Sequence, residues 1–490
     1  MSEASPVVLG IDVGTQGAKA VLYDLSSHAV LAKGSSSNSI LPSDVPGRAE
    51  QHPATWLQGV REAVAQVLCG LDAARVRGVA VSGQQHGLVV LDAEGQVQRV
   101  LRPAKLWCDT ESAAEAAELS HTLEWTLVPS FTITKLLWLK RHEPEVFARV
   151  ACVLLPHDYV NLWLTGRRVM EFGDASGTGF LDVGARRWSE GAMDAVDPRV
   201  RAEGMLPPLV GPNEAIGTLL AEVAAELGLP GGILVAPGSG DNACSALGAG
   251  LAGDGATVMS LGTSGTLFAR SATPILDPTG IICPFCDATG AYLPLLCTLN
   301  CTRVLEEVRE SFGLEHAELT CLAQSEPPGC SGVTWLPYMI GERTPSWPHA
   351  TGALLGLRPG CLRPGLLYRA AMEGSTLSLL SGYRRMLAAG LSPCDELRLV
   401  GGGANNPLWR QVVADAFQMK VLLPAEADSA ALGAALQAAA IVEGATVAGY
   451  VAAHPLPSLG QVVTPKTEHK QAYEAALRLF EQMGAHLFAR

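Results

Sequence analysis

The chain carries the same hairpin motif twice, about half its length apart. Apolar residues 7–13 lead into the turn Gly14-Thr15-Gln16-Gly17, and residues 256–261 lead into Gly262-Thr263-Ser264-Gly265. In both copies a further apolar strand is expected directly after the turn. The second copy begins 248 residues after the first, at Gly262 against Gly14. A repeat at this distance predicts two related domains and excludes a short-period solenoid.

Expected strands alternate with expected helices along the rest of the chain. The apolar patterns predict strands over 77–82, 151–155, 233–236 and 396–400, and helices over 112–119, 135–139, 221–227, 364–387 and 407–417. This alternation predicts an α/β fold. The domain boundary is expected near 248–254, which divides the chain into domains 1–250 and 251–490.

Charge and composition exclude several classes of protein. The net charge of −13, the pI near 5.4 and the lack of a Lys/Arg block argue against nucleic-acid binding. The first residues carry no basic and apolar leader, and the Ala-rich stretch 429–453 is too interrupted to span a bilayer. We therefore expect a cytoplasmic enzyme with no membrane partner.

The 12 cysteines are scattered, mostly in apolar segments. Cys283 and Cys286 have C-x-x-C spacing, but a second compact pair of metal ligands is missing. A zinc site stays open as an alternative, and reduced structural thiols are the favoured interpretation.

The two turns are candidate phosphate sites. A glycine turn exposes successive backbone N–H groups, which can bind phosphate oxygens without cationic side chains. Asp12 ends the first strand and could hold Mg²⁺ through water, and Lys19 lies just beyond the turn. One such turn is as easily ligand-free, but two of them predict a cleft around a nucleoside triphosphate. A Walker A loop is absent from the sequence.

Asp241 follows the turn Gly238-Ser239-Gly240 and precedes a small-residue helix over 243–250. A carboxylate at this position suits a base that accepts the proton of an attacking hydroxyl group. An Asp before a helix is also a common helix cap, and this alternative stays open.

Three further segments carry polar groups at strand ends. Gln85 and His86 offer donors and acceptors suited to a polyhydroxylated ligand, and Trp107 beside Asp109 would suit a sugar. Structural roles for the same residues stay open. Gly401-Gly402-Gly403 follows a strand and lets the backbone lie against a planar group such as adenine, or forms a plain turn.

Taken together, these motifs resemble the FGGY family of carbohydrate kinases, and within it the xylulokinases. The matching stretches are 10–24, 82–87, 131–148, 153–166, 173–178, 238–250, 260–266, 336–345 and 401–417. They span nearly the whole chain. The resemblance implies the two-domain actin/hexokinase-like fold, with ribonuclease-H-like cores and the active site in the interdomain cleft.

The resemblance also implies roles for individual residues. Asp241 would be the catalytic base and a further candidate metal ligand, with Asp12 assisting at the metal and phosphate. The expected sugar contacts are Gln85, His86, Asp109 and Asn242. The expected nucleotide contacts are Gly14, Thr15, Gln16, Lys19, Gly262, Thr263, Ser264, Gly402, Gly403, Ala404 and Asn405.

The implied reaction is MgATP-dependent phosphorylation of D-xylulose at O5. Alternatives are a kinase for another ketose or polyol (ribulose, fuculose, gluconate or glycerol), an actin-like chaperone ATPase, and a glycoside hydrolase. The family's W-N-D-x-R pattern departs here at Cys108 and Glu111, an exchange expected to bear on sugar preference. A homodimer is compatible with the sequence, which favours no interface.

Overall fold

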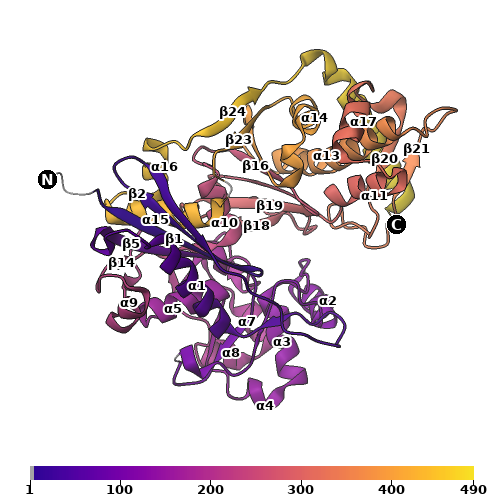
Figure 1. Ribbon diagram of the computed structural model, residues 1–490. Helices are drawn as coiled ribbons and strands as arrows, with labels where there is room; N and C mark the ends of the chain where they lie inside the picture. The colour runs from indigo at the N-terminus through magenta and orange to yellow at the C-terminus, as the bar shows by residue number, and fades with distance from the viewer. Residues whose placement is uncertain (1–4, 96, 427, 490) are drawn as a thin grey trace.

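The computed structural model describes residues 5–95, 97–426 and 428–489. It has two lobes, each built on a seven-stranded sheet (Figure 1). We call the sheet of the N-terminal half with the helices packed on it the first lobe, and the other sheet with its helices the second lobe.

The first sheet has the order β13-β14-β5-β1-β2-β3, with β15 also paired to β5. Its strands are β1 (Val7–Gly14), β2 (Gly17–Asp24), β3 (Ala29–Ser35), β5 (Val76–Gly83), β13 (Gly217–Thr218), β14 (Leu234–Val235) and β15 (Ser239–Gly240). The second sheet has the order β18-β19-β17-β16-β22-β23-β24. Its strands are β16 (Thr257–Leu261), β17 (Gly265–Ala269), β18 (Cys283–Cys286), β19 (Tyr292–Thr298), β22 (Glu396–Val400), β23 (Lys420–Pro424) and β24 (Ser458–Val463).

The two sheets repeat one arrangement. β1 pairs antiparallel with β2 and parallel with β5, and β16 pairs antiparallel with β17 and parallel with β22. The next strands repeat it too, because β14 runs parallel to β5 and β23 runs parallel to β22. The duplication expected from the two hairpin motifs is therefore present in the fold.

Helices surround both sheets, and short strands connect them. The helices are α1 (Pro53–Val67), α2 (Ala113–Leu123), α3 (Thr132–His142), α4 (Pro144–Phe147), α5 (Pro156–Thr165), α6 (Phe172–Ala175), α7 (Glu190–Val196), α8 (Pro198–Ala202), α9 (Ala221–Leu227), α10 (Asp241–Gly248), α11 (Thr302–Phe312), α12 (His316–Gln324), α13 (Pro364–Ala388), α14 (Pro407–Phe417), α15 (Ser429–Val442), α16 (Val447–Ala453) and α17 (Lys470–Phe488). The short strands are β4 (Glu50–Gln51), β6 (Val89–Leu91), β7 (Ala104–Lys105), β8 (Cys152–Leu154), β9 (Met170–Glu171), β10 (Leu181–Asp182), β11 (Arg187–Trp188), β12 (Leu209–Val210), β20 (Thr334–Leu336) and β21 (Ala353–Leu355).

β1 carries no polar side chain other than that of Asp12, because both of its faces are covered. Val7, Leu9 and Ile11 belong to one hydrophobic cluster, which includes residues of α1 and α5. Val8 points the other way, into a cluster that includes residues of α10 and α15. Alternate side chains of one strand therefore hold two helical layers in place.

The chain does not divide into two continuous units at residue 250. The sequence assigned 251–490 to one domain, but α15 packs on β1, β2 and β5 of the first sheet and against α10 (Figure 1). The contact is close, since a Cβ at Gly10 would lie 2.0 Å from the carbonyl oxygen of Ala431. That prediction is corrected for α15 and α16, which belong to the first lobe. The sequence of an apolar helix such as α15 shows that the helix is buried, but not which sheet it packs on.

Candidate functional site

Parallel pairing brings the first lobe's candidate residues to one sheet edge. Asp12 and Ser239 both lie opposite Ser82 of β5, from β1 and from β15. Asp241 follows β15, and Gln85 and His86 follow β5. The carboxyl ends of parallel strands are where open α/β sheets bind ligands. In the sequence, these residues were recognised because each lies near a glycine that ends a predicted strand.

Asp241 is the first residue of α10, and Gly240 occupies the N-cap position. The cap interpretation of Asp241 is therefore wrong. Its Oδ1 atom is buried and has no hydrogen-bond partner among the described residues. Burial, followed by the charges of Asp12 and Asp174, raises the pKa of Asp241 to about 8. Such a carboxyl group can accept a proton or face a cation.

Asp12 is the second carboxyl group at this edge. Ser82 donates a hydrogen bond of 2.8 Å from Oγ to Asp12 Oδ1. Burial raises the pKa of Asp12 to about 6, although this hydrogen bond and the Lys19 charge oppose the rise. Because the carboxylates of Asp12 and Asp241 disfavour each other's charge, a divalent cation between their oxygens would stabilise both.

Gln85, His86 and Asn242 line the same edge. Asn242 donates from Nδ2 to Gln85 Oε1 at 2.6 Å. His86 Nδ1 lies 2.7 Å from the Gly177 carbonyl oxygen, which can only accept, so Nδ1 carries the proton. Burial, followed by the Lys135 charge, lowers the pKa of His86 to about 3, so the ring is neutral. His86 Nε2 is then an acceptor for a ligand hydroxyl group.

The His86 ring also contacts a residue that sequence analysis missed. Its centroid lies 5.2 Å from that of Phe131 and 5.8 Å from that of Phe285. Phe285 lies in β18 of the second lobe, between Cys283 and Cys286. This C-x-x-C segment therefore carries an aromatic ring to the cleft. Among the described residues, the groups of side chains arranged to hold a metal include no cysteine.

Asp109 is not free for a sugar. Its Oδ2 accepts from the Ala49 N–H at 2.9 Å, and both of its oxygens accept from Lys105 Nζ, at 3.1 and 3.3 Å. Its side chain is fully buried. The prediction of Asp109 as a direct sugar contact is corrected on this geometry, because its hydrogen-bonding capacity is used inside the protein.

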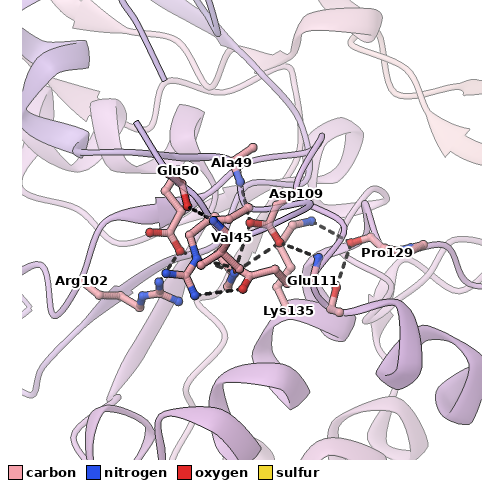
Figure 2. Close-up of polar contacts among 12 residues, drawn as sticks. Val45, Ala49, Glu50, Arg102, Asp109, Glu111, Pro129 and Lys135 are labelled. Atoms are coloured by element: carbon pink, nitrogen blue, oxygen red, sulfur yellow. Dashed lines mark hydrogen bonds and ion pairs between the residues drawn. The ribbon is translucent and has the colours of Figure 1, made fainter. Parts of the chain in front are cut away.

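Asp109 belongs to a buried ion cluster, shown in Figure 2. Its members are Glu50, Lys105, Asp109 and Glu111, with Arg48 and Arg102 at its rim. Glu111 accepts from Arg48 at 2.9 and 3.0 Å and pairs with Lys105. An Arg at position 111 would face both cations. The Arg-to-Glu departure thus fits its own surroundings, and its contacts give no support to the expected effect on sugar preference.

We expect Glu111→Gln to lower the free energy of unfolding by about 3 kcal/mol at pH 7, because it leaves Lys105 under-compensated inside the protein. Glu118→Gln, which removes an exposed partner of Arg141, should cost less than about 1 kcal/mol. Urea denaturation of both variants measures the difference. An equal cost for both would contradict the role of Glu111 in the buried ion cluster.

The Glu111 contribution should also depend on pH. Burial alone would raise the pKa of Glu111, but the hydrogen bonds and charges of Arg48 and Lys105 outweigh burial and lower it. A lowered folded-state pKa gives stability that is present above the unfolded value of about 4.3. It is lost as the pH falls through the folded value. The stability difference between wild type and Glu111→Gln should therefore shrink below pH 4.

The first hairpin turn is fixed by side chains around it. Thr15 Oγ1 donates to Gln84 Oε1 at 2.7 Å and accepts from Trp107 Nε1 at 2.9 Å. The carbonyl oxygen of Thr15 accepts from Gln51 Nε2 at 2.7 Å, and that of Gln16 accepts from the Asn38 N–H at 2.8 Å. Engaged carbonyl groups favour an anion over a cation at the turn.

Lys19, predicted as a nucleotide contact, has a different partner in the structure. Its Nζ lies 3.0 Å from Asp428 Oδ1, in the residue before α15. The ion pair joins β2 to the N-terminus of α15. From the sequence alone, a lysine just beyond a glycine turn could not be assigned either to a nucleotide phosphate or to a distant carboxylate.

The second lobe contains a pocket of about 620 Å³. Three of the expected nucleotide contacts line it, Gly402, Gly403 and Asn405, together with Thr302, Leu305, Glu306, His316, Ala317, Thr320, Tyr368, Asn406, Pro407 and Trp409. Ala404 does not: it is buried in the core of the second lobe. Sequence reasoning missed the walls from α11, α12 and α13, because a helix that carries no strand-end turn gives no local sign of a ligand.

The second hairpin turn adjoins this pocket. The Gly262 and Thr263 carbonyl oxygens accept from the N–H groups of Thr302 and Cys301, at 2.9 and 3.1 Å. Thr302 also lines the pocket. Because β16 runs parallel to β22, Gly262 to Ser264 and the Gly401 turn lie at one sheet edge.

Among the described residues, no single helix has both the length and the apolar composition needed to cross a membrane. α15 and α16 taken together would have that length and composition, but the chain bends by 104° between the two helices.

Residues 7–248 match the N-terminal domain of the FGGY family of carbohydrate kinases, and residues 257–441 match its C-terminal domain. Proteins named xylulose kinase from Streptomyces coelicolor and Haemophilus influenzae are 42% and 37% identical over 453 and 446 residues, respectively. These alignments cover 90% and 88% of this chain, and 89% and 90% of the relatives.

A solved structure titled as a xyloylose kinase from Brucella ovis has 34% identity and a TM-score of 0.91, and the match covers 98% of this chain and 99% of that one. The expected two-domain sugar-kinase fold is confirmed.

Proposed function

The chain belongs to the FGGY family of carbohydrate kinases, and on that premise we propose that it phosphorylates D-xylulose at O5 with ATP. The family assignment makes the protein a phosphotransferase, as the motifs predicted. The choice of sugar rests on the relatives named xylulose kinase. The observation that carries the chemistry is the Asp241 carboxyl group, whose Oδ1 has no partner in the described part of the chain and which lies at the sheet edge beside Asp12.

In the proposed reaction, Gln85, His86 and Asn242 hold the sugar hydroxyl groups. Asp241 accepts the O5 proton as O5 bonds to the γ-phosphorus and the bond from that phosphorus to the β–γ bridging oxygen breaks, which releases ADP. Little covalent chemistry is left to the protein, so orientation of the two substrates supplies much of the acceleration. Positioning by the two hairpin turns would hold the phosphates in line with O5.

Sugar kinases of this family use ATP, and magnesium is the proposed metal. The oxygen-rich pair Asp12 and Asp241 fits such an ion, because both carboxyl groups are held near one another with raised pKa values. When bound with ATP, Mg²⁺ neutralises charge that develops on the phosphates. Asp12 would act through water, and the residues of the 620 Å³ pocket would hold the base and ribose.

Of the alternatives, a kinase for ribulose, fuculose, gluconate or glycerol would share this architecture and differ only at the sugar contacts. A chaperone ATPase is disfavoured, because the family models that match residues 7–248 and 257–441 are those of carbohydrate kinases. A glycoside hydrolase has no use for the nucleotide pocket.

ADP release with MgATP and a panel of sugars tests the proposal. The panel contains D-xylulose, L-xylulose, D-ribulose, L-ribulose, L-fuculose, gluconate and glycerol. We expect kcat/KM for D-xylulose to exceed every other member by about 100-fold or more. ³¹P NMR should identify the product as the 5-phosphate. Preference for another sugar would overturn the substrate and keep the kinase. Sugar-independent ADP release alone would overturn the sugar kinase itself.

A further inference from the structure

His157, in the first turn of α5, lies behind the catalytic edge and is fully buried. Its Nε2 atom is 2.7 Å from the carbonyl oxygen of Pro237, four residues before Asp241. Asn161 Nδ2 lies 3.0 Å from the same ring nitrogen, but it donates to the Pro237 carbonyl oxygen at 2.7 Å. Because that oxygen can only accept, its short contact with Nε2 requires a proton on Nε2. Its Nδ1 atom lies 3.2 Å from Asp158 Oδ1 and 3.4 Å from Asp174 Oδ2. The ring therefore bridges the residues before Asp241 and two buried carboxyl groups.

A neutral ring with its proton on Nε2 would turn a lone pair toward both carboxylates. That arrangement is repulsive, and it becomes attractive when Nδ1 also carries a proton. Asp158 Oδ1 and both Asp174 oxygens have no hydrogen-bond partner among the described residues. A protonated, positively charged Nδ1 would supply the partner that these three oxygen atoms lack.

The surrounding elements supply no other cation. Asp158 and Asn161 face the ring from α5, Asp174 faces it from α6, and the Glu171 carboxyl group lies nearby at the N-cap of α6. Within the described residues, no Lys or Arg forms an ion pair with any of these carboxyl groups. Glu171 accepts instead from Ser239 Oγ at 2.6 Å and from the Gly173 N–H at 2.9 Å.

The ring is also enclosed by backbone. A Cβ at Gly83 would lie 2.9 Å from His157 Cβ, and a Cβ at Gly238 would lie 2.8 Å from His157 Nε2. The end of β5 thus closes on the backbone and Cβ of His157, and the turn before Asp241 closes on its imidazole. Because the ring has little room to move, a change in its position would also move the turn.

We propose that His157 is a permanently protonated, buried positioning residue that joins α5 and α6 to the Pro237–Asp241 turn and so fixes the place of Asp241. Burial alone would lower the pKa of His157, but its interaction with the nearby Asp158 and Asp174 carboxyl groups raises it to about 10. The kinetic part of this inference rests on the proposed kinase function.

The test compares His157→Gln, which is neutral, with His157→Lys, which keeps a cation. We expect His157→Gln to lower kcat about 100-fold with little change in KM for ATP, because a displaced base is costly. His157→Lys should recover most of that loss. His142→Gln, at an exposed histidine 3.4 Å from Glu115, is the matched control and should leave kcat within about twofold. Equal kcat values for folded His157→Gln and wild type would overturn the positioning role, as would a Lys variant no more active than the Gln variant.

A second readout needs no turnover. In ¹⁵N-histidine NMR, the resonances of His157 are identified as those that disappear in His157→Lys. In the wild type at pH 8.5, their chemical shifts should be those of a ring with both nitrogens protonated. A neutral ring at that pH would overturn the proposal. So would one equivalent of metal in purified wild type that is absent from His157→Lys, because an ion would then occupy the place of the proton. If every sugar fails while the ring is protonated, the proposed substrate fails and the charge assignment stands.

Discussion

Replacing Asp241 by Asn should lower kcat for sugar phosphorylation at least about 1,000-fold while ATP binding stays within about threefold of wild type. The Asn side chain keeps the shape of the carboxylate but cannot accept the sugar proton. The 620 Å³ pocket proposed for the nucleotide lies in the second lobe, and Asp241 is not among its lining residues. Single-turnover phosphorylation and ATP titration by calorimetry measure the two effects separately.

The matched control for this prediction is Asp44→Asn, at an exposed aspartate, which should retain full activity. Asp241→Ala, which removes the carboxyl group altogether, should lose as much activity as the Asn variant. A folded Asp241→Asn protein that has lost ATP binding would show that this residue acts on the nucleotide instead. Activity near wild type would remove Asp241 from the mechanism.

Gly402→Phe should raise KM for ATP about 100-fold or more, equivalent to roughly 3 kcal/mol of binding. Gly402 lines the 620 Å³ pocket, and a Cβ built on it meets no atom within 4 Å. A phenyl ring can therefore enter the pocket without displacing the core, so the melting temperature should hold. Steady-state kinetics at saturating sugar measure KM.

Two further glycine variants separate a blocked pocket from a damaged fold. Gly253→Phe, at an exposed glycine whose Cβ also meets nothing, should leave KM for ATP unchanged. At Gly403 a Cβ would lie 2.7 Å from the Trp409 ring, so Gly403→Ala should lower the melting temperature as well. An unchanged KM for ATP in Gly402→Phe would place the nucleotide elsewhere.

Local sequence patterns predicted the parts of this protein that depend on short-range geometry. The predicted elements 221–227, 396–400 and 407–417 begin and end where α9, β22 and α14 do. Asp12, Gln85 and Asp241 were found because each lies at or just beyond the end of a buried strand, and parallel pairing then brings such positions to one edge.

The remaining features depend on contacts between distant segments, which no local pattern encodes. The sequence pattern predicts Asp109 as a sugar ligand, but in the structure its oxygens accept hydrogen bonds from Lys105 and the Ala49 N–H. Phe285 reaches His86 from the opposite lobe. His157 becomes chemically distinctive only beside Asp174, which is 17 positions along the chain and folded back onto it.

The attachment of α15 to the first sheet has a consequence for the order in which the protein is made. β1 and β5 are synthesised early, but the helix that covers their inner face begins at Ser429. At about 5–20 residues per second, a ribosome needs roughly 10 to 40 s to travel from residue 250 to that helix. Val8, Val21 and Ala80, which face that helical layer, lack its cover during this interval. Both lobes therefore reach completion together near the end of translation, and a nascent chain halted at mid-length contains no finished lobe.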